Sequence, residues 1–119
     1  EGVAVFRDPI DSRLFLLGSH LTGWEANSAM LYVSDRREVC GSEWTFLGNP
    51  GVGPGAESTF GAQSTFVLPF RNSCNQTTMV MMADAWHYPN ESLASYVWLP
   101  LRRSDTGNWT VQWTDEWTL

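Results

Sequence analysis

Two polar residues stand at matching places in the chain, and both could take part in acid–base chemistry. Glu1 precedes an apolar stretch at residues 2–6, and Gln63 precedes a similar stretch at residues 64–68. A carboxyl group among apolar neighbours suits a general acid, whereas an amide can hold a hydroxyl group or orient a water molecule but is a poor base. The alternatives are a solvated carboxyl group at the start of the chain and an amide that only binds.

Further candidates for ligand contacts lie near the two apolar stretches. Trp24 and Trp86 occupy equivalent loops, where aromatic rings could stack on a sugar or simply pack against each other. Asp84 could hold sugar hydroxyl groups or form a turn. His20 and His87 lie close by, but two histidines without cysteine or paired carboxylate ligands make a poor metal site. The sequence therefore predicts neither a metal site nor a cofactor.

These residues belong to a repeat of about 60 residues. Apolar runs and turn residues predict four short strands in each unit, at residues 2–6, 14–19, 29–34 and 44–48 and again at 64–68, 79–84, 95–101 and 109–113. Four antiparallel strands make one blade of a β-propeller, and the innermost strand of each blade lines the central channel. We therefore expect an all-β fold in which residues 1–50 and 51–119 are successive blades, with Glu1 and Gln63 facing one axial pocket.

The length of the chain limits this fold. A closed propeller usually has four to eight blades, so two blades predict the C-terminal part of a larger domain whose N-terminal blades are absent, and that part is expected to be inactive alone. Residues 49–61 are rich in Gly and Pro and are expected to form an irregular crossover between the blades. Most of the seven tryptophans are expected in the core.

Composition narrows the classes of partner and the location. Asp and Glu outnumber the basic residues by 13 to 7, which argues against binding nucleic acid. No apolar run approaches the ~18 residues that would predict a membrane-spanning helix. Three glycosylation sequons, beginning at Asn75, Asn90 and Asn108, favour an extracellular location. Cys40 and Cys74 could pair or stay free.

Five sequence blocks follow one another in an order that resembles glycoside hydrolase family 43, in particular its exo-β-1,3-galactanase branch. The blocks are residues 1–6, 18–27, 44–50, 58–65 and 96–101, and they extend along almost the whole chain. The resemblance implies a five-bladed propeller that cleaves glycosidic bonds with inversion and releases galactose from the non-reducing end of β-1,3-galactan. The expected partner is an oligosaccharide or polysaccharide, and the full-length protein is expected to be a monomer.

The resemblance also implies roles for individual residues. Glu1 would be the general acid, and Gln63, within the Gly-x-Gln-Ser-Thr block, would stand where most of the family has an aspartate base. Thr22 and Trp24 match loop positions that look like substrate contacts, and Asp84 would be a further one. An inverting site needs ~6.5–9.5 Å between its acid and base groups to admit a water molecule.

Two other functions stay open. The first is a carbohydrate-binding propeller without turnover, because the same fold can occur in proteins that have no catalytic activity. The second is the arabinosidase or xylosidase specificity found elsewhere in family 43. The block around Gln63 argues against the second, because those relatives use a carboxylate base.

Overall fold

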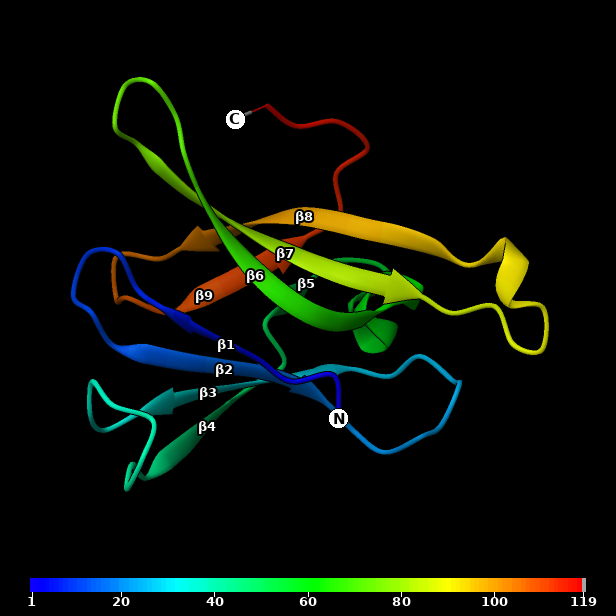
Figure 1. The fold of residues 1–119 in the computed structure, drawn as a ribbon, viewed down its shortest axis with the longest axis horizontal. Coiled ribbons are helices and arrows are strands. Elements are labelled where there is room, and N and C mark those ends of the chain that lie inside the picture. Colours follow the sequence, from blue (N-terminus) through cyan, green and yellow to red (C-terminus); the bar gives the residue numbers. More distant parts are fainter. Residues whose placement is uncertain (119) are drawn as a thin grey trace.

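The computed structural model describes residues 1–118, and its strands form two sheets (Figure 1). The first sheet is an antiparallel meander, and its strands are β1 (Ala4–Arg7), β2 (Leu14–Ser19), β3 (Ala29–Ser34) and β4 (Trp44–Gly48). The second has the order β5-β9-β8-β7-β6, and its strands are β5 (Gly51–Val52), β6 (Gln63–Arg71), β7 (Thr77–Ala85), β8 (Ser95–Arg103) and β9 (Trp109–Gln112). The all-β prediction and its eight strands are confirmed to within a few residues. The two sheets do not close into a ring within the described residues.

The segment expected to be an irregular crossover is partly regular. Residues Gly51–Val52 form β5, which pairs in parallel with β9, and the backbone nitrogen of Val111 also donates to the carbonyl of Pro50 at 2.9 Å. The 3-10 helix η1 (Ala56–Gly61) follows, and a second one, η2 (Glu91–Leu93), lies between β7 and β8. The prediction missed β5 because a segment of two residues is too short to show an apolar alternation. Gly51 and Val52 form a strand only because they pair with β9, which is distant in the sequence. Among the described residues there is no helix with the length and apolar character needed to cross a bilayer.

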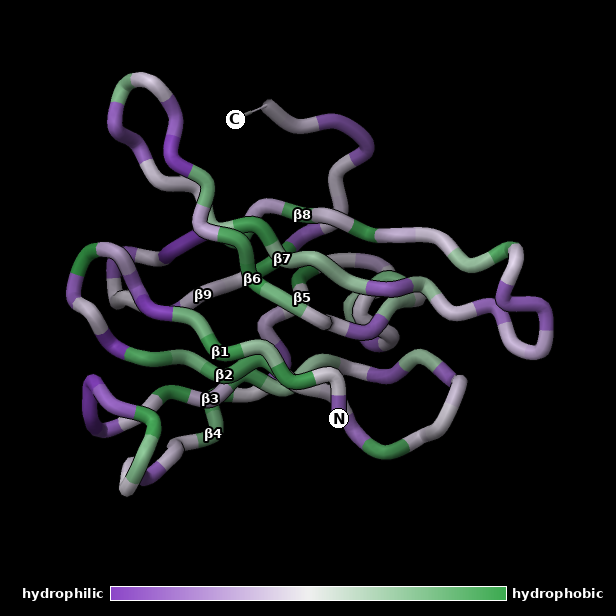
Figure 2. Tube along the Cα trace, viewed as in Figure 1, coloured by the Kyte–Doolittle hydropathy of each residue, from purple (hydrophilic) through white to green (hydrophobic). Residues whose placement is uncertain are grey.

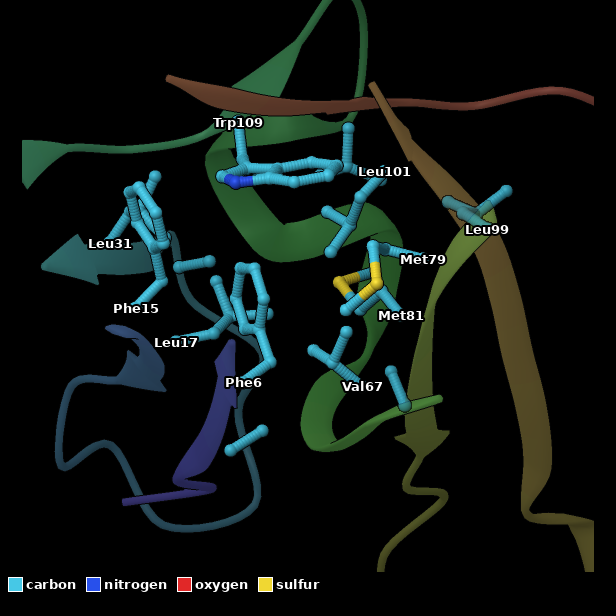
Figure 3. Packing of buried hydrophobic residues seen from close by; sticks show 14 of the residues in the cluster. Phe6, Phe15, Leu17, Leu31, Val67, Met79, Met81, Leu99, Leu101 and Trp109 are labelled. Atoms are coloured by element: carbon cyan, nitrogen blue, oxygen red, sulfur yellow. The ribbon is translucent and has the colours of Figure 1, made fainter. Parts of the chain in front are cut away.

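The core lies between the two sheets, where buried side chains of β1, β2 and β3 face those of β6, β7, β8 and β9 (Figure 3). Phe6 of β1 stacks on Phe15 of β2 with ring centroids 5.5 Å apart, and Trp109 of β9 meets Phe6 edge-on at 5.8 Å. Figure 2 shows apolar residues along the crossing strands and polar residues in the turns. The larger buried side chains come from both sheets and are Phe6, Phe15, Leu17, Leu31, Val67, Met79, Met81, Leu99, Leu101 and Trp109.

The outer face of each sheet is also apolar but lies uncovered. Val5 and Phe46 are exposed on the first sheet, and Phe66 and Trp98 on the second. The neighbours of Val5 and Trp98 along their strands are buried in the core, as the two-residue period of a strand requires, whereas no residue of β4 is buried.

The expectation that most tryptophans lie in the core is therefore wrong. Of the seven, only Trp109 is buried, and four are between 41% and 51% exposed: Trp24, Trp86, Trp98 and Trp113. Composition alone cannot distinguish a core face from an outer face of the same strand. Cys40 and Cys74 are both exposed and free.

An ionic network fastens the two sheets at the end where β1 turns into β2. Asp8, which is fully buried, accepts a hydrogen bond from Nε of Arg103 at 2.6 Å. Arg103 also donates to Asp11 at 2.7 Å, and Arg13 donates to Asp11 at 3.0 Å and to the carbonyl of Gly107 at 2.9 Å. The turn of residues 8–13 in the first sheet is thereby bound to the turn between β8 and β9 in the second. We call these four charged residues the ionic clasp.

Candidate functional site

Gln63 is the first residue of β6, and both ends of its side-chain amide are bonded. Nε2 donates to Oγ of Ser19 at 2.8 Å, and Oε1 accepts from the indole nitrogen of Trp86 at 3.3 Å. Each bond uses one of the two donors or one of the two acceptor positions of the amide. Among the contacts of the described residues, one N–H and one lone pair therefore remain for a ligand or a water molecule.

Ser19, at the end of β2, joins the two sheets at this point. Its side chain is only 5% exposed, and Oγ donates to the backbone carbonyl of Glu1 at 2.9 Å while it accepts from Gln63. The hydroxyl group of Ser19 thus links the backbone of Glu1 to the side chain of Gln63. Sequence reasoning gave Ser19 no role of its own, although Ser19 lies in the block at residues 18–27 that carries the family resemblance.

Glu1 does not lie on a strand, and it is not crowded by apolar neighbours as expected. It is exposed and precedes β1, and its backbone pairs with Ser19 through bonds of 2.7 and 2.8 Å. Because Ala4 opposes Leu17 in the β1–β2 register, this pairing leaves one extra residue on the first strand. The first strand therefore has a bulge at Gly2, and Glu1 beyond the bulge is exposed.

Gly2 makes this bulge possible. Its φ of +61° lies in the left-handed region that favours glycine, and its carbonyl accepts from Oγ of Ser64 at 2.7 Å. A Cβ atom at Gly2 would lie 2.5 Å from Cγ of Gln63 and 2.7 Å from the carbonyl oxygen of Ser64. The backbone that carries Glu1 therefore approaches β6 more closely than any larger residue would permit.

Glu1 and Gln63 line one open pocket together with Gly23, Trp24 and Trp86. The two tryptophans were expected in equivalent loops, and the structure brings them together edge-on with ring centroids 5.4 Å apart. Both remain exposed, at 51% for Trp24 and 41% for Trp86. The pocket therefore places a carboxyl group and an amide beside exposed aromatic rings.

Tyr88 extends this aromatic group, and sequence reasoning missed it. Its ring stacks on Trp24 at 5.2 Å with an interplanar angle of 4°. The signal that could have found it is a third aromatic side chain two residues after Trp86.

Thr22 and Asp84 do not line this pocket. The hydroxyl group of Thr22 donates to the carbonyl of Glu25 at 2.6 Å and accepts from the side chain of Asn27 at 2.5 Å, so it orders the loop that carries Trp24. Asp84 of β7 lies directly opposite Gln63 in the strand register. Directly opposed residues project from the same face of a sheet, so Asp84 lies beside Gln63 on that face.

Comparison with known proteins matches this arrangement to solved structures. No protein-family model matches the sequence, and no curated protein matches it. A family 43 β-1,3-galactosidase solved with galactodeoxynojirimycin aligns over the whole chain with a TM-score of 0.87 and 34% identity, and a second family 43 β-1,3-galactosidase aligns over the whole chain with 0.83 and 28%. The exo-β-1,3-galactanase of Clostridium thermocellum aligns over 93% of the chain with 0.77 and 25%.

These matches confirm the resemblance to glycoside hydrolase family 43 and its β-1,3-galactosidases. The alignments cover 32%, 24% and 23% of the three solved chains, so this chain spans a third or less of their length.

Proposed function

We propose that these residues form part of the active site of a glycoside hydrolase that acts on β-1,3-galactan and removes galactose from its non-reducing end. The observation that carries the proposal is the pocket in which Glu1, which precedes the first sheet, and Gln63 of the second sheet meet beside Trp24 and Trp86. The similarity to β-1,3-galactosidases supports the class of substrate.

Glu1 would act as the general acid. Its exposed carboxyl group would give a proton to the glycosidic oxygen as the bond from that oxygen to the anomeric carbon breaks. Gln63 would act on the opposite face of the sugar ring. The free lone pair of its Oε1 would accept a hydrogen bond from the attacking water molecule and orient it toward the anomeric carbon, so that attack from the face opposite the leaving group gives inversion. The proton that the water loses would pass to bulk solvent, from which Glu1 is protonated again.

The surrounding side chains would hold the sugar. Trp24 and Trp86 expose apolar ring surface of the kind that packs on the apolar face of a pyranose. Asp84, on the same face of the sheet as Gln63, would accept hydrogen bonds from sugar hydroxyl groups. Thr22 would contribute through the loop that carries Trp24.

The two sheets would be consecutive blades, at residues 1–50 and 51–119, of a five-bladed propeller in an extracellular, monomeric enzyme. The uncovered apolar faces support this part of the proposal. Phe46 on one sheet and Phe66 and Trp98 on the other stand on opposite outer faces, where a further blade on each side would bury them. Because half of the pocket would come from those blades, residues 1–119 alone would be inactive.

Hydrolysis of β-1,3-galactan by the full-length protein tests the proposal. Glu1→Gln should lower kcat by about 10²–10⁴, because it removes the proton donor and keeps the shape of the side chain. Glu38→Gln is the matched control, since Glu38 is an exposed acid in the loop between β3 and β4, and it should leave kcat unchanged. The first product seen by NMR should be α-galactose, as inversion requires.

Other outcomes would replace the proposal. Binding of galactan without turnover by the wild-type protein would identify a carbohydrate-binding propeller. Release of arabinose or xylose from other polysaccharides, with galactan untouched, would identify another specificity of family 43.

A further inference from the structure

We infer that Trp86 and Ser19 are positioning residues that hold the amide of Gln63 in a single orientation, with its oxygen toward Trp86 and its nitrogen toward Ser19. This inference rests on the role proposed above for Gln63. It assigns Trp86 a function other than stacking on a sugar, and it gives Ser19 a part in the site.

The chemistry of the two neighbours fixes the orientation. The indole nitrogen of Trp86 can only donate, so the group of Gln63 that it meets at 3.3 Å must be the oxygen. The hydroxyl group of Ser19 has one proton, which goes to the carbonyl of Glu1 at 2.9 Å, so Ser19 meets the nitrogen of Gln63 as an acceptor at 2.8 Å. An amide turned by 180° would place two donors together at Trp86 and two acceptors together at Ser19.

The two neighbours differ in how strictly they enforce this orientation. A serine hydroxyl group both donates and accepts, so Ser19 could rotate and serve a turned amide at the loss of its bond to Glu1. An indole cannot adapt in this way. Trp86 therefore fixes the position of the oxygen of Gln63, and Ser19 links the nitrogen at the other end of the amide to the backbone of Glu1.

This orientation has a consequence for the proposed reaction. The oxygen of Gln63, with one lone pair free, lies beside Trp86 in the pocket that Glu1 also lines. A water molecule can donate a hydrogen bond to that oxygen, which keeps the lone pairs of the water available for attack on the anomeric carbon. A turned amide would present an N–H instead and would bind the water by the lone pair that has to react.

Trp86→Phe in the full-length protein tests this, because it keeps an aromatic ring and deletes the donor. We expect kcat on a β-1,3-galacto-oligosaccharide to fall by about 10- to 100-fold, with KM within about threefold, since a bond that orients the reacting water acts on the chemical step. Trp24→Phe is the matched control from the same pocket, and as a contact to the sugar it should change KM more than kcat. An equal effect of the two substitutions on kcat, or no effect of Trp86→Phe, would overturn the inference.

A second measurement is independent of turnover. With ¹⁵N-labelled glutamine, the side-chain amide protons of Gln63 should show one proton shifted and slowed in exchange by its bond to Ser19. Ser19→Ala should abolish this protection, and Ser19→Thr, which keeps the hydroxyl group, should restore it. If the protein hydrolyses no galactan but shows this pattern, the positioning stands and the proposed function fails. A freely exchanging Gln63 amide in the wild-type protein would overturn the positioning itself.

Discussion

The two sheets are joined at both ends of β1, but the two junctions have opposite character. At one end, the ionic clasp joins them through charged groups, with Asp8 fully buried and bonded to Arg103 at 2.6 Å and to the backbone nitrogen of Ile10 at 2.8 Å. At the other end, Ser19 and Gln63 join them through neutral groups, and Gln63 also lines the open pocket that contains Glu1. Figure 1 shows the turns of the first junction and the loops of the second at opposite ends of the sheets.

The charged junction is expected to contribute mainly to stability and the neutral junction mainly to the proposed reaction. A buried carboxylate bonded to a guanidinium group and to backbone N–H groups has little capacity left for a ligand, and removal of one partner is costly. A neutral junction with a free lone pair and a free N–H holds the sheets more weakly but can still bind. We expect substitutions in the clasp to act on folding, and substitutions near Gln63 to act mainly on the proposed reaction.

Asp8→Ala should have the largest effect on folding. It leaves Nε of Arg103 and the backbone nitrogen of Ile10 without their acceptor, so the free energy of unfolding should fall by about 3–5 kcal/mol, measured by urea denaturation. Arg36→Gln is the control, because its ion pair with Asp35 is exposed and its atoms are 3.7 Å apart, and the change should be below about 1 kcal/mol. Equal losses in both variants would mean that the clasp does not fasten the sheets.

Gly2→Ala should have an intermediate effect on folding and a large one on activity. The new Cβ would overlap Gln63 and the carbonyl of Ser64, and the residue would still have to adopt a positive φ, so we expect a loss of about 1–3 kcal/mol. Turnover by the full-length protein should fall by more than about tenfold, because Gln63 must move.

Gly23→Ala separates the two causes. Gly23 also has a positive φ, of +64°, but a Cβ there would meet nothing within 4 Å. The Gly23→Ala variant should lose only the free energy that a positive φ costs an alanine, about 1 kcal/mol. If the two variants lose the same free energy of unfolding, the close approach of Gly2 to Gln63 adds nothing to the cost of the substitution.

The pH dependence of stability gives the smallest expected effect. Burial opposes ionisation of Asp11, but hydrogen bonds from the backbone and side chain of Arg13, with the nearby charge and a bond from Arg103, outweigh it and hold the pKa of Asp11 below its ordinary 3.8. A lowered pKa in the folded state means that the stabilisation is complete above pH 3.8 and is lost as the pH falls through the folded-state value.

The stability advantage of the wild-type protein over Asp11→Asn should therefore shrink on acidification below pH 3.8. We expect the whole effect to stay below about 1 kcal/mol, because a third of the Asp11 side chain is open to solvent. Urea denaturation of both proteins at a series of pH values measures it. An advantage that grows on acidification would contradict the assignment.

The strands, and the placement of Glu1 and Gln63 beside one pocket, could be predicted because their signals are local or repeated. Each strand has its own apolar period and turn residues, and the repeat placed both polar residues at the start of equivalent segments. The bonds that give the site its geometry could not be predicted. Ser19 contacts Gln63 across 44 positions, and Asp8 contacts Arg103 across 95. Such contacts depend on how the two sheets pack, and no local sequence pattern indicates which residues will meet.

The pairing of β5 with β9 changes how the second sheet can come apart. Without β5, the last strand of the sheet would be a free edge that could peel away one hydrogen bond at a time. With Gly51 and Val52 along its other side, β9 is paired on both sides at Val111, and Gln112 beyond the end of the β8 pairing is paired with Val52. Since β5 directly follows β4, a pull on the end of β9 is resisted by the link between the sheets. A segment of two residues thus adds a second set of backbone bonds that must break before the end of β9 can separate from the sheet.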